Sequence, residues 1–333
     1  MDQGPVIRKH SRERRRRRGW IVILLLGLVI TGSGMVKLIG YGIDLLSSRR
    51  TARELREVYD ETPAEEESLA AAIPEIAEVP ETEPEPAAET ETRMEAAAEP
   101  ESEPESAAPE VRKTARKLQN AGYPGNHDLQ VSSRFQRLQE KSGNIVGWLT
   151  ISGMLDEPVT RRDNDFYLDH NASGEPNING AIFLDAAIGL DSRPYTYLLY
   201  GHNMKTGAMF GSLRNYENSA FYRKDPFITF DTMYEKGRFV VFSAGVVSTE
   251  ERSDKYVDFY ALKSRNIQGR QQAIDSLIGA SVHSCEIDVE PEDQLLVLVT
   301  CVDKDEERRV VAARRVRDGE NEATLKNQVK KSW

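Results

Sequence analysis

A long acidic segment limits which part of this chain can fold. Residues 51–110 contain twenty Asp and Glu side chains but only three Lys and Arg, a net charge of about −17. From residue 61 the segment is rich in Glu, Pro, Ala and Thr, so it could bury too little apolar surface to offset the entropy cost of ordering. Charge repulsion and proline should extend it. We therefore expect a disordered extracellular stalk over 47–126, a folded domain over 127–320 and a C-terminal tail over 321–333.

The formal net charge of −10 describes this acidic segment rather than the folded domain. Residues 1–18 carry eight basic and two acidic side chains, a net of about +6, and residues 19–50 sum to +2. Residues 111–333 are then close to neutral, near −1. A nearly neutral domain gives no support for a nucleic-acid partner.

An apolar stretch near the N-terminus predicts a membrane anchor. It begins at Trp20 and runs to Val36, and after Lys37 it continues mostly apolar to Leu46. This length is sufficient to cross a bilayer, and the lysine could snorkel to the interface. A cleaved signal peptide is the alternative, but the apolar region is longer than usual and no clear Ala-x-Ala site follows it.

Five consecutive arginines, at positions 14–18, precede the apolar stretch. Such a cluster remains on the cytoplasmic side of a membrane. We therefore expect a cytoplasmic tail over 1–18 and a single-pass signal anchor over 19–46. The domain that follows would lie outside the cell.

Short strand-like runs dominate the expected folded domain, with turn-rich segments between them. They lie at residues 145–151, 181–184, 195–200, 227–230, 238–247, 295–301 and 310–316. A capping-box pattern at Ser133 and Gln136 predicts a short helix that ends near Ser142, and a second helix is expected over 267–278. Many short strands with few helices indicate a mainly β fold with added helices, either a closed barrel or a sandwich.

Cys301 closes the apolar run that starts at Leu295, so a buried strand should present its thiol at the carboxyl end. Cys285 is the other cysteine, which leaves no disulfide framework and no cysteine-rich metal site. A single thiol at a strand end, with histidine and arginine elsewhere in the chain, is a candidate nucleophile. The alternative is an inert buried cysteine, which is the commoner role.

A histidine and an arginine follow two other strand-like runs. His202 comes directly after the run that ends at Tyr200, in a glycine-flanked turn, so two strand ends could bring His202 and Cys301 together. Beyond Cys301, a polar loop leads to a strand that should be antiparallel to the cysteine strand. An arginine at its start could stabilise an oxyanion and favour the thiolate. Considered alone, His202 would more commonly be a surface residue. An arginine here would more commonly form an ion pair with Glu306 or Glu307.

Several blocks of sequence together resemble the signature of class B sortases. These blocks are Tyr200-Gly-His-Asn-Met-x-x-Gly-x-Met-Phe, the Leu-x-Thr-Cys strand that ends at Cys301 with the following Arg-x-Val, Asn144-Ile-Val-Gly-Trp-Leu-Thr-Ile, Pro158-Val with Asn164-Asp-Phe-Tyr-Leu, and Gly180-Ala-Ile-Phe-Leu-Asp. They occur in the family's order and cover residues 130–317. The resemblance implies a closed sortase-type β-barrel of about eight strands, with a short N-terminal helix and a helix before the cysteine strand.

The resemblance also implies a reaction. In such enzymes the cysteine, here Cys301, attacks the threonine carbonyl of a sorting signal near the carboxyl terminus of a secreted protein. An amine of the peptidoglycan precursor or stem peptide then resolves the thioacyl enzyme. His202 would be the general acid/base and an arginine the oxyanion stabiliser, with no metal and no cofactor. The implied location is the outer face of the membrane of a Gram-positive-type cell.

Two adjacent arginines compete for the oxyanion role. An ungapped alignment from Cys301 favours Arg309, whereas an alignment on the pair Val310-Val311 favours Arg308. We expect Arg309. Because neighbouring side chains on a strand point to opposite faces, only one of the two can serve.

Family position suggests which residues line the substrate groove. Asn164 and Leu168 would share one helix face at i, i+4 spacing, and Tyr200 and Thr300 would lie beside them. Val299 stands where the family often has a hydroxyl side chain, so the substrate preference could differ. Cys285 belongs to none of the matching blocks and should be a bystander.

Three other functions remain open from the sequence. A catalytically silent relative would bind sorting signals without cutting them. A hydrolase would use water to resolve the thioacyl intermediate. A pilus polymerase would use a pilin lysine as its acceptor.

Overall fold

The computed structural model describes residues 35–37, 39–61, 123–302 and 306–331. The expected cytoplasmic tail, most of the expected anchor and most of the expected stalk lie outside these residues. By its contacts the chain divides into two units, residues 1–62 with 117–333 and residues 63–116, and every element below belongs to the first. Within the described residues, no helix is both long enough and apolar enough to span a membrane.

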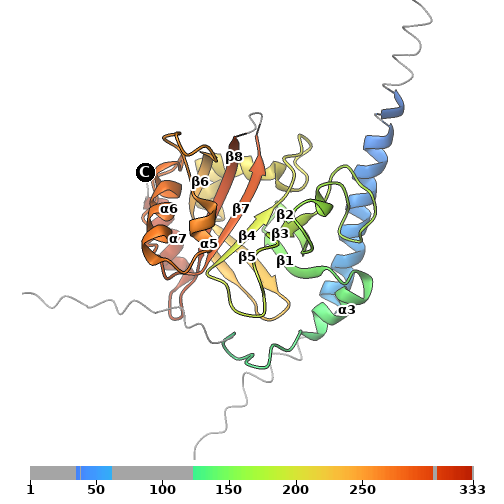
Figure 1. The fold of residues 1–333 in the computed structure, drawn as a ribbon, viewed down its shortest axis with the longest axis horizontal. Helices are drawn as coiled ribbons and strands as arrows, with labels where there is room; N and C mark the ends of the chain where they lie inside the picture. The colour runs from blue at the N-terminus through green and yellow to red at the C-terminus, as the bar shows by residue number, and fades with distance from the viewer. Residues whose placement is uncertain (1–34, 38, 62–122, 303–305, 332–333) are drawn as a thin grey trace, which may run out of the picture. The chain divides into compact units, whose positions relative to one another are not determined.

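Eight strands form a closed barrel in the order β1-β2-β3-β4-β7-β8-β6-β5 (Figure 1). They are β1 (Ile145–Ile151), β2 (Leu155–Thr160), β3 (Ile182–Leu184), β4 (Thr196–Tyr200), β5 (Phe227–Thr232), β6 (Arg238–Ser248), β7 (Leu295–Cys301) and β8 (Glu307–Arg315). The pairs β2–β3 and β4–β7 are parallel, and the other pairs are antiparallel. The prediction of a closed barrel of about eight strands is confirmed.

Strand β7 lies between β4 and β8 and is buried on both faces. Six successive residues from Leu295 to Thr300 are buried, and Cys301 is exposed. A strand covered on both faces has a continuous apolar sequence. This is why the apolar run from Leu295 predicted a buried strand. The cover includes α5 (Phe259–Lys263) and α6 (Ile267–Gly279), which contribute Leu262 and Leu277 to the barrel's apolar cluster.

Seven helices or 3-10 turns accompany the strands in the described residues after position 123. They are α3 (Ser133–Lys141), η1 (Phe166–Leu168), η2 (Phe210–Glu217), α4 (Ser219–Lys224), α5 (Phe259–Lys263), α6 (Ile267–Gly279) and α7 (Glu322–Lys331). The predicted helices at α3 and α6 are confirmed. The capping box is wrong, because Ser132 is the N-cap of α3 and makes no side-chain cap hydrogen bond. Helices α4 and α5 are too short to show an apolar period.

A helix over residues 39–60 replaces the first part of the predicted stalk. Leu55 and Tyr59 are buried against the domain, and the Tyr59 ring stacks on Trp148 with centroids 4.5 Å apart. The same apolar cluster contains Phe135 and Leu138 of α3. The stalk prediction is therefore wrong for residues 47–60. It relied on the average acidic composition of the segment, which hides the apolar i, i+4 pair Leu55 and Tyr59.

The predicted C-terminal tail contains α7. Leu325 and Val329 of this helix are buried in the main apolar cluster. Arg238 of β6 forms an ion pair with Glu322 at the start of α7, with a separation of 3.1 Å. The folded domain therefore extends beyond residue 320.

Candidate active site

Cys301 and His202 lie at the ends of two neighbouring parallel strands. Tyr200 on β4 is the register partner of Val299 on β7. Just beyond it, the Gly201 amide donates to the Val299 carbonyl at 3.3 Å. Two positions past this register pair, β4 leads to His202 and β7 ends at Cys301. The parallel pairing thus brings the imidazole and the thiol to the same edge of the barrel.

The imidazole of His202 is held by a backbone carbonyl. Its Nε2 lies 2.6 Å from the carbonyl oxygen of Leu168. A carbonyl only accepts hydrogen bonds, so Nε2 carries the proton and Nδ1 is the acceptor nitrogen of the neutral ring. Behind the ring, the chain folds back tightly, and a Cβ on Gly211 would lie 2.0 Å from the Met204 carbonyl oxygen. The glycine-flanked turn therefore positions His202 by a close backbone approach that only glycine permits.

The two thiols lie in different surroundings. Both cysteines are free, but Cys301 is exposed whereas Cys285 is partly buried. Burial raises the pKa of the Cys285 thiol, although Tyr222, whose hydroxyl oxygen is 3.0 Å from the sulfur, acts in the opposite direction. A buried thiol with a raised pKa is a poor nucleophile. Cys301 is thus the thiol that a substrate can reach.

The strand register distinguishes the two arginines. Cys301 pairs with Arg308, and Thr300 pairs with Arg309. Directly opposed residues of an antiparallel pair point to the same face, so the Arg308 side chain shares the face of the thiol. The Arg309 Nε instead donates to Glu217 Oε1 at 2.8 Å. The structure therefore places Arg308, and not the expected Arg309, on the face of the cysteine, because strand register and not sequence offset decides which arginine faces it.

Tyr200 lies on the same side as Arg308 and is tied to a buried carboxylate. Its hydroxyl donates to Asp185 Oδ2 at 3.0 Å. Burial, followed by the charge and hydrogen bond of Asp185, raises the pKa of Tyr200, and the positive charge of Arg308 opposes this. Tyr200 therefore remains a neutral hydroxyl near the face that carries the thiol.

The structure separates the other expected groove residues. Leu168 is exposed at the end of η1. Asn164 precedes η1, and its Oδ1 accepts the Ala186 amide at 2.8 Å. The expectation of a shared helix face is wrong, because the helical turn begins only at Phe166. Asn164 thus holds the loop after β3.

Val299 and Thr300 lie on opposite faces of β7. Alternation places Val299 on the face of Cys301, but its side chain is buried. Thr300 is buried on the other face, and its Oγ1 has no hydrogen-bond partner among the described residues. The geometry gives Thr300 no direct access to a substrate on the cysteine face.

Sequence reasoning missed the role of Asp185 and Lys263. The Lys263 ammonium of α5 donates to Asp185 Oδ2 at 3.0 Å, beside the Tyr200 hydroxyl. Asp185 is the last residue of the Gly-Ala-Ile-Phe-Leu-Asp block, so a signal was present in the sequence without an assigned role. Together the two residues attach α5 to the loop that joins β3 and β4.

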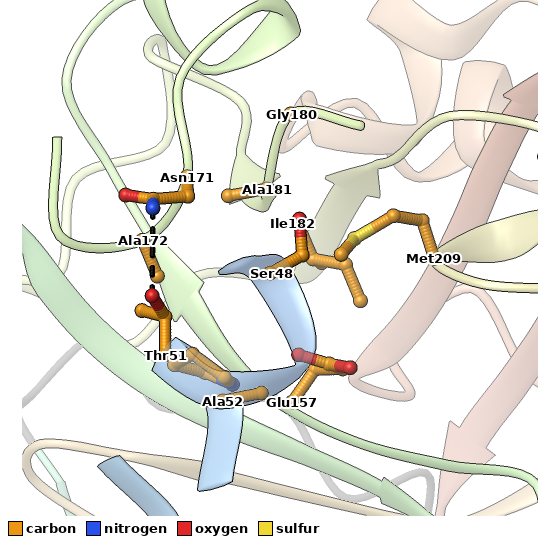
Figure 2. A pocket seen from close by; sticks show the side chains of 11 residues that line it. Ser48, Thr51, Ala52, Glu157, Asn171, Ala172, Gly180, Ala181, Ile182 and Met209 are labelled. Atoms are coloured by element: carbon orange, nitrogen blue, oxygen red, sulfur yellow. Dashed lines mark hydrogen bonds between the residues drawn. The ribbon is translucent and has the colours of Figure 1, made fainter. Parts of the chain in front are cut away.

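The pocket drawn in Figure 2 is separate from the thiol. It lies between the helix over 39–60 and the barrel, and neither Cys301 nor His202 lines it. Its lining residues are Ser48, Thr51, Ala52, Glu157, Pro158, Asn171, Ala172, Gly180, Ala181, Ile182 and Met209. Across the described ranges, no cluster of three or more His, Cys, Asp or Glu side chains is placed to hold a metal ion.

Comparison with known proteins agrees with this geometry. The family model for the sortase domain matches residues 156–316. Sortase B of Staphylococcus aureus is 32% identical over 57% of this chain and 77% of its own length. Sortase B of Listeria monocytogenes is 29% identical over 55% of this chain and 73% of its own length.

Solved structures show the same likeness. A Staphylococcus aureus sortase B–substrate complex has a TM-score of 0.51 and 31% identity, covering 58% of this chain and 89% of that one. A Bacillus anthracis protein described as similar to sortase B has a TM-score of 0.51 and 30% identity, with coverage of 57% and 85%. A sortase B complexed with triglycine has a TM-score of 0.51 and 31% identity, with coverage of 58% and 90%.

The chain therefore belongs to the sortase family, whose members are cysteine transpeptidases. The relatives and structures named above are sortase B proteins or similar to sortase B, so the resemblance to class B is confirmed.

Proposed function

We propose that this chain is a membrane-anchored transpeptidase that cleaves a sorting signal after threonine and joins the new carboxyl end to a cell-wall amine. The observation that carries the proposal is the exposed Cys301 thiol, with His202 at the adjacent strand end and Arg308 directly opposite. The substrate complex of the Staphylococcus aureus relative supports the binding of a substrate by such a fold.

Each residue has a defined task in the first half-reaction. The Cys301 thiol gives its proton to His202, and the sulfur attacks the threonine carbonyl carbon. A guanidinium offers several N–H donors in a planar fork, so Arg308 can hold the tetrahedral oxyanion while it forms. His202 then protonates the leaving amine as the C–N bond breaks. A thioacyl enzyme remains.

The second half-reaction uses an amine acceptor. The amine attacks the thioacyl carbon and gives a proton to His202, and Cys301 departs and recovers that proton. The complex of a solved sortase B with triglycine supports a small amine acceptor. Water or a pilin lysine could also attack the same intermediate. The identity of the acceptor therefore distinguishes a cell-wall transpeptidase from a hydrolase, which uses water, and from a pilus polymerase, which uses the lysine.

The apolar sequence that starts at Trp20 and the arginine cluster before it support the membrane location. The catalytic domain would then lie on the outer side of the membrane. Its substrates would be secreted proteins that carry a threonine-containing signal near the carboxyl terminus.

Peptide cleavage tests the proposal. The full chain is incubated with a library of threonine-containing peptides, with and without triglycine, and Cys301→Ala and Cys285→Ala are run in parallel. We expect cleavage and amide products that disappear in Cys301→Ala and persist in Cys285→Ala. Complete absence of a Cys301-dependent thioacyl adduct would overturn the proposal that the chain is an enzyme. It would favour the alternative that the chain binds sorting signals without cutting them. Cleavage that triglycine does not redirect would identify a hydrolase.

A further inference from the structure

The helix over residues 39–60 (the N-terminal helix) is hydrogen-bonded to one loop of the barrel domain. This loop, residues 169–181, is called the Asn loop here because three buried asparagines face the helix from it. Ser48 Oγ donates to Asn177 Oδ1 at 2.9 Å, and Asn179 Nδ2 donates to Ser48 Oγ at 3.3 Å. Ser48 is therefore the donor to one asparagine and the acceptor from another.

Two further bonds join the same elements. Asn177 Nδ2 donates to the Asp44 carbonyl at 2.9 Å, and Asn171 Nδ2 donates to Thr51 Oγ1 at 3.4 Å. Figure 2 shows the second bond crossing from the loop to the helix. Because these amides are buried, loss of their partners would leave polar groups unpaired away from water, which is costly.

The Asn loop has almost no regular structure of its own. Asn171 Oδ1 accepts the amides of Ser173 and Glu175, and Asn177 Oδ1 accepts the amide of Asn179. The asparagine side chains thus shape the loop backbone and bind the helix at the same time. Any shift of the asparagines should move the loop with them.

The base of the Asn loop positions the carbonyl that holds His202. The Asn177 amide donates to Asp169 O at 2.8 Å, and the Ala181 amide donates to Tyr167 O at 2.9 Å. Gly180 has a φ of +61°, and a Cβ there would lie 2.4 Å from the Tyr167 carbonyl oxygen. The Ala181 end of the loop therefore closes on η1, which carries the Leu168 carbonyl, and the Asn177 end closes on Asp169, the residue directly after η1.

We propose that Ser48 is a positioning residue for His202, acting through Asn177, the Asn loop and the Leu168 carbonyl. The hydroxyl orients the asparagine amides, the loop base then sets the Leu168 oxygen, and that oxygen keeps the proton on His202 Nε2. This rests on the proposed role of His202 as general acid/base. Residues 39–46 of the expected membrane anchor are part of the N-terminal helix, so the same contacts join that part of the chain to the imidazole.

The test compares full-chain variants. Ser48→Ala removes the hydroxyl, Ser48→Thr retains it, and Arg50→Ala is the matched control, because Arg50 and Glu54 form an ion pair on the same helix with side chains 82% and 60% exposed. General acid/base catalysis typically raises a reaction rate by a factor of about 10²–10⁴. An imidazole that is misplaced but still present should lose part of this factor, so we expect kcat to fall roughly tenfold in Ser48→Ala with KM little changed. Ser48→Thr should recover most of the rate, and Arg50→Ala should lose none.

A second readout does not depend on turnover. In protein with ¹⁵N-labelled histidine, assigned with a His202→Asn variant, we expect the wild type and Ser48→Thr to show the Nε2-protonated form of His202. Ser48→Ala should show a mixture of the two tautomers and a displaced pH profile of kcat/KM. An unchanged tautomer and pH profile in Ser48→Ala would overturn the inference even if the enzyme is active.

The two proposals fail in distinguishable ways. If no Cys301-dependent turnover exists, the imidazole spectrum still reports whether Ser48 positions the ring. If Ser48→Ala unfolds at assay temperature, Thr51→Val serves in its place, because it removes only the hydroxyl that accepts from Asn171. It should shift the tautomer in the same direction by a smaller amount, and no shift in that variant would also overturn the inference.

Discussion

Arg308 lies directly opposite Cys301 across the β7–β8 pair, and Arg309 lies opposite the buried Thr300. Two adjacent arginines of identical chemistry thus lie on opposite faces of one strand. Only the first shares the face of the thiol, so under the proposed mechanism it alone would meet the charge that develops at the attacked carbonyl.

Substitution of each arginine separates these two roles. We expect Arg308→Ala to lower kcat/KM by about 10²–10³, the typical cost of a lost oxyanion donor, and Arg309→Ala to lower it less than about tenfold. Arg308→Lys keeps the charge but loses the fork of donors, so it should recover only part of the rate. Steady-state kinetics with a cleavable sorting peptide measures all three. Equal losses in the two alanine variants would contradict the assignment of Arg308.

The docking of the N-terminal helix should be visible in stability. Tyr59 stacks on Trp148 and donates to Asp231 Oδ2 at 2.7 Å. Tyr59→Phe should lower the free energy of unfolding by about 1.5–3 kcal/mol, because a hydrogen bond to a charged group is lost. Tyr59→Ala should cost about 3–5 kcal/mol.

Chemical denaturation of the Tyr59 variants measures these losses. Tyr260→Phe is the matched control, because Tyr260 is 80% exposed. It should change the free energy of unfolding by less than about 0.5 kcal/mol. A Tyr59→Ala protein as stable as the control would show that the helix is not docked in solution.

Lys263 should matter for substrate binding more than for chemistry. Its ammonium and the Tyr200 hydroxyl both bind Asp185 Oδ2. In Lys263→Met the carboxylate keeps Tyr200 and the Ala187 amide but loses its ion pair, so we expect a loss of about 2 kcal/mol in the free energy of unfolding. Because α5 would be released from the loop after β3, KM for the peptide should rise with kcat little changed. The exposed Lys224→Met serves as the control, and a fall in kcat alone would disagree with this role.

Glu157 should make the domain less stable as the pH rises. Burial, with a smaller contribution from Asp156, raises the pKa of the Glu157 carboxyl to about 8 from an ordinary value near 4.5. Between these values the folded state binds more protons than the unfolded state, so the free energy of unfolding decreases with pH across that window. The stabilisation is complete below about pH 4.5 and is lost above about pH 8.

Glu157→Gln tests this dependence, because the amide stays neutral at every pH. We expect its unfolding temperature to decrease less than that of the wild type between pH 5 and pH 8.5, and to exceed the wild-type value at the upper end. Thermal unfolding at several pH values measures both effects, with the exposed Glu140→Gln as control. Parallel curves for Glu157→Gln and the wild type would reject the raised pKa.

The strands that the sequence predicts well are those buried on both faces or strictly bounded by turns. The predicted bounds of β1 and β7 match the structure, because their apolar runs end sharply. Strand β2 was missed, because Asp156, Glu157 and Pro158 interrupt its apolar pattern while neighbouring strands and the N-terminal helix supply the burial.

The candidate site also contains residues that the sequence predicts and residues that it does not. Apolar runs that end at Cys301 and near His202 indicate where two strands stop, and parallel pairing then makes them meet. Which arginine faces the thiol depends on the β7–β8 register, and no local pattern encodes it. The Leu168 carbonyl and the Ser48 hydroxyl could not be predicted either, because both act through contacts between residues distant in sequence.

The shared apolar cluster of Tyr59 and Phe135 also changes what the acidic segment between them can do. Both of its flanks are held by one domain, so its length does not determine how far the N-terminal helix lies from the barrel. Loop-closure entropy grows only slowly with length, by about 0.6 kcal/mol per doubling. Deletions or insertions of tens of residues between positions 62 and 122 should therefore be nearly neutral for folding.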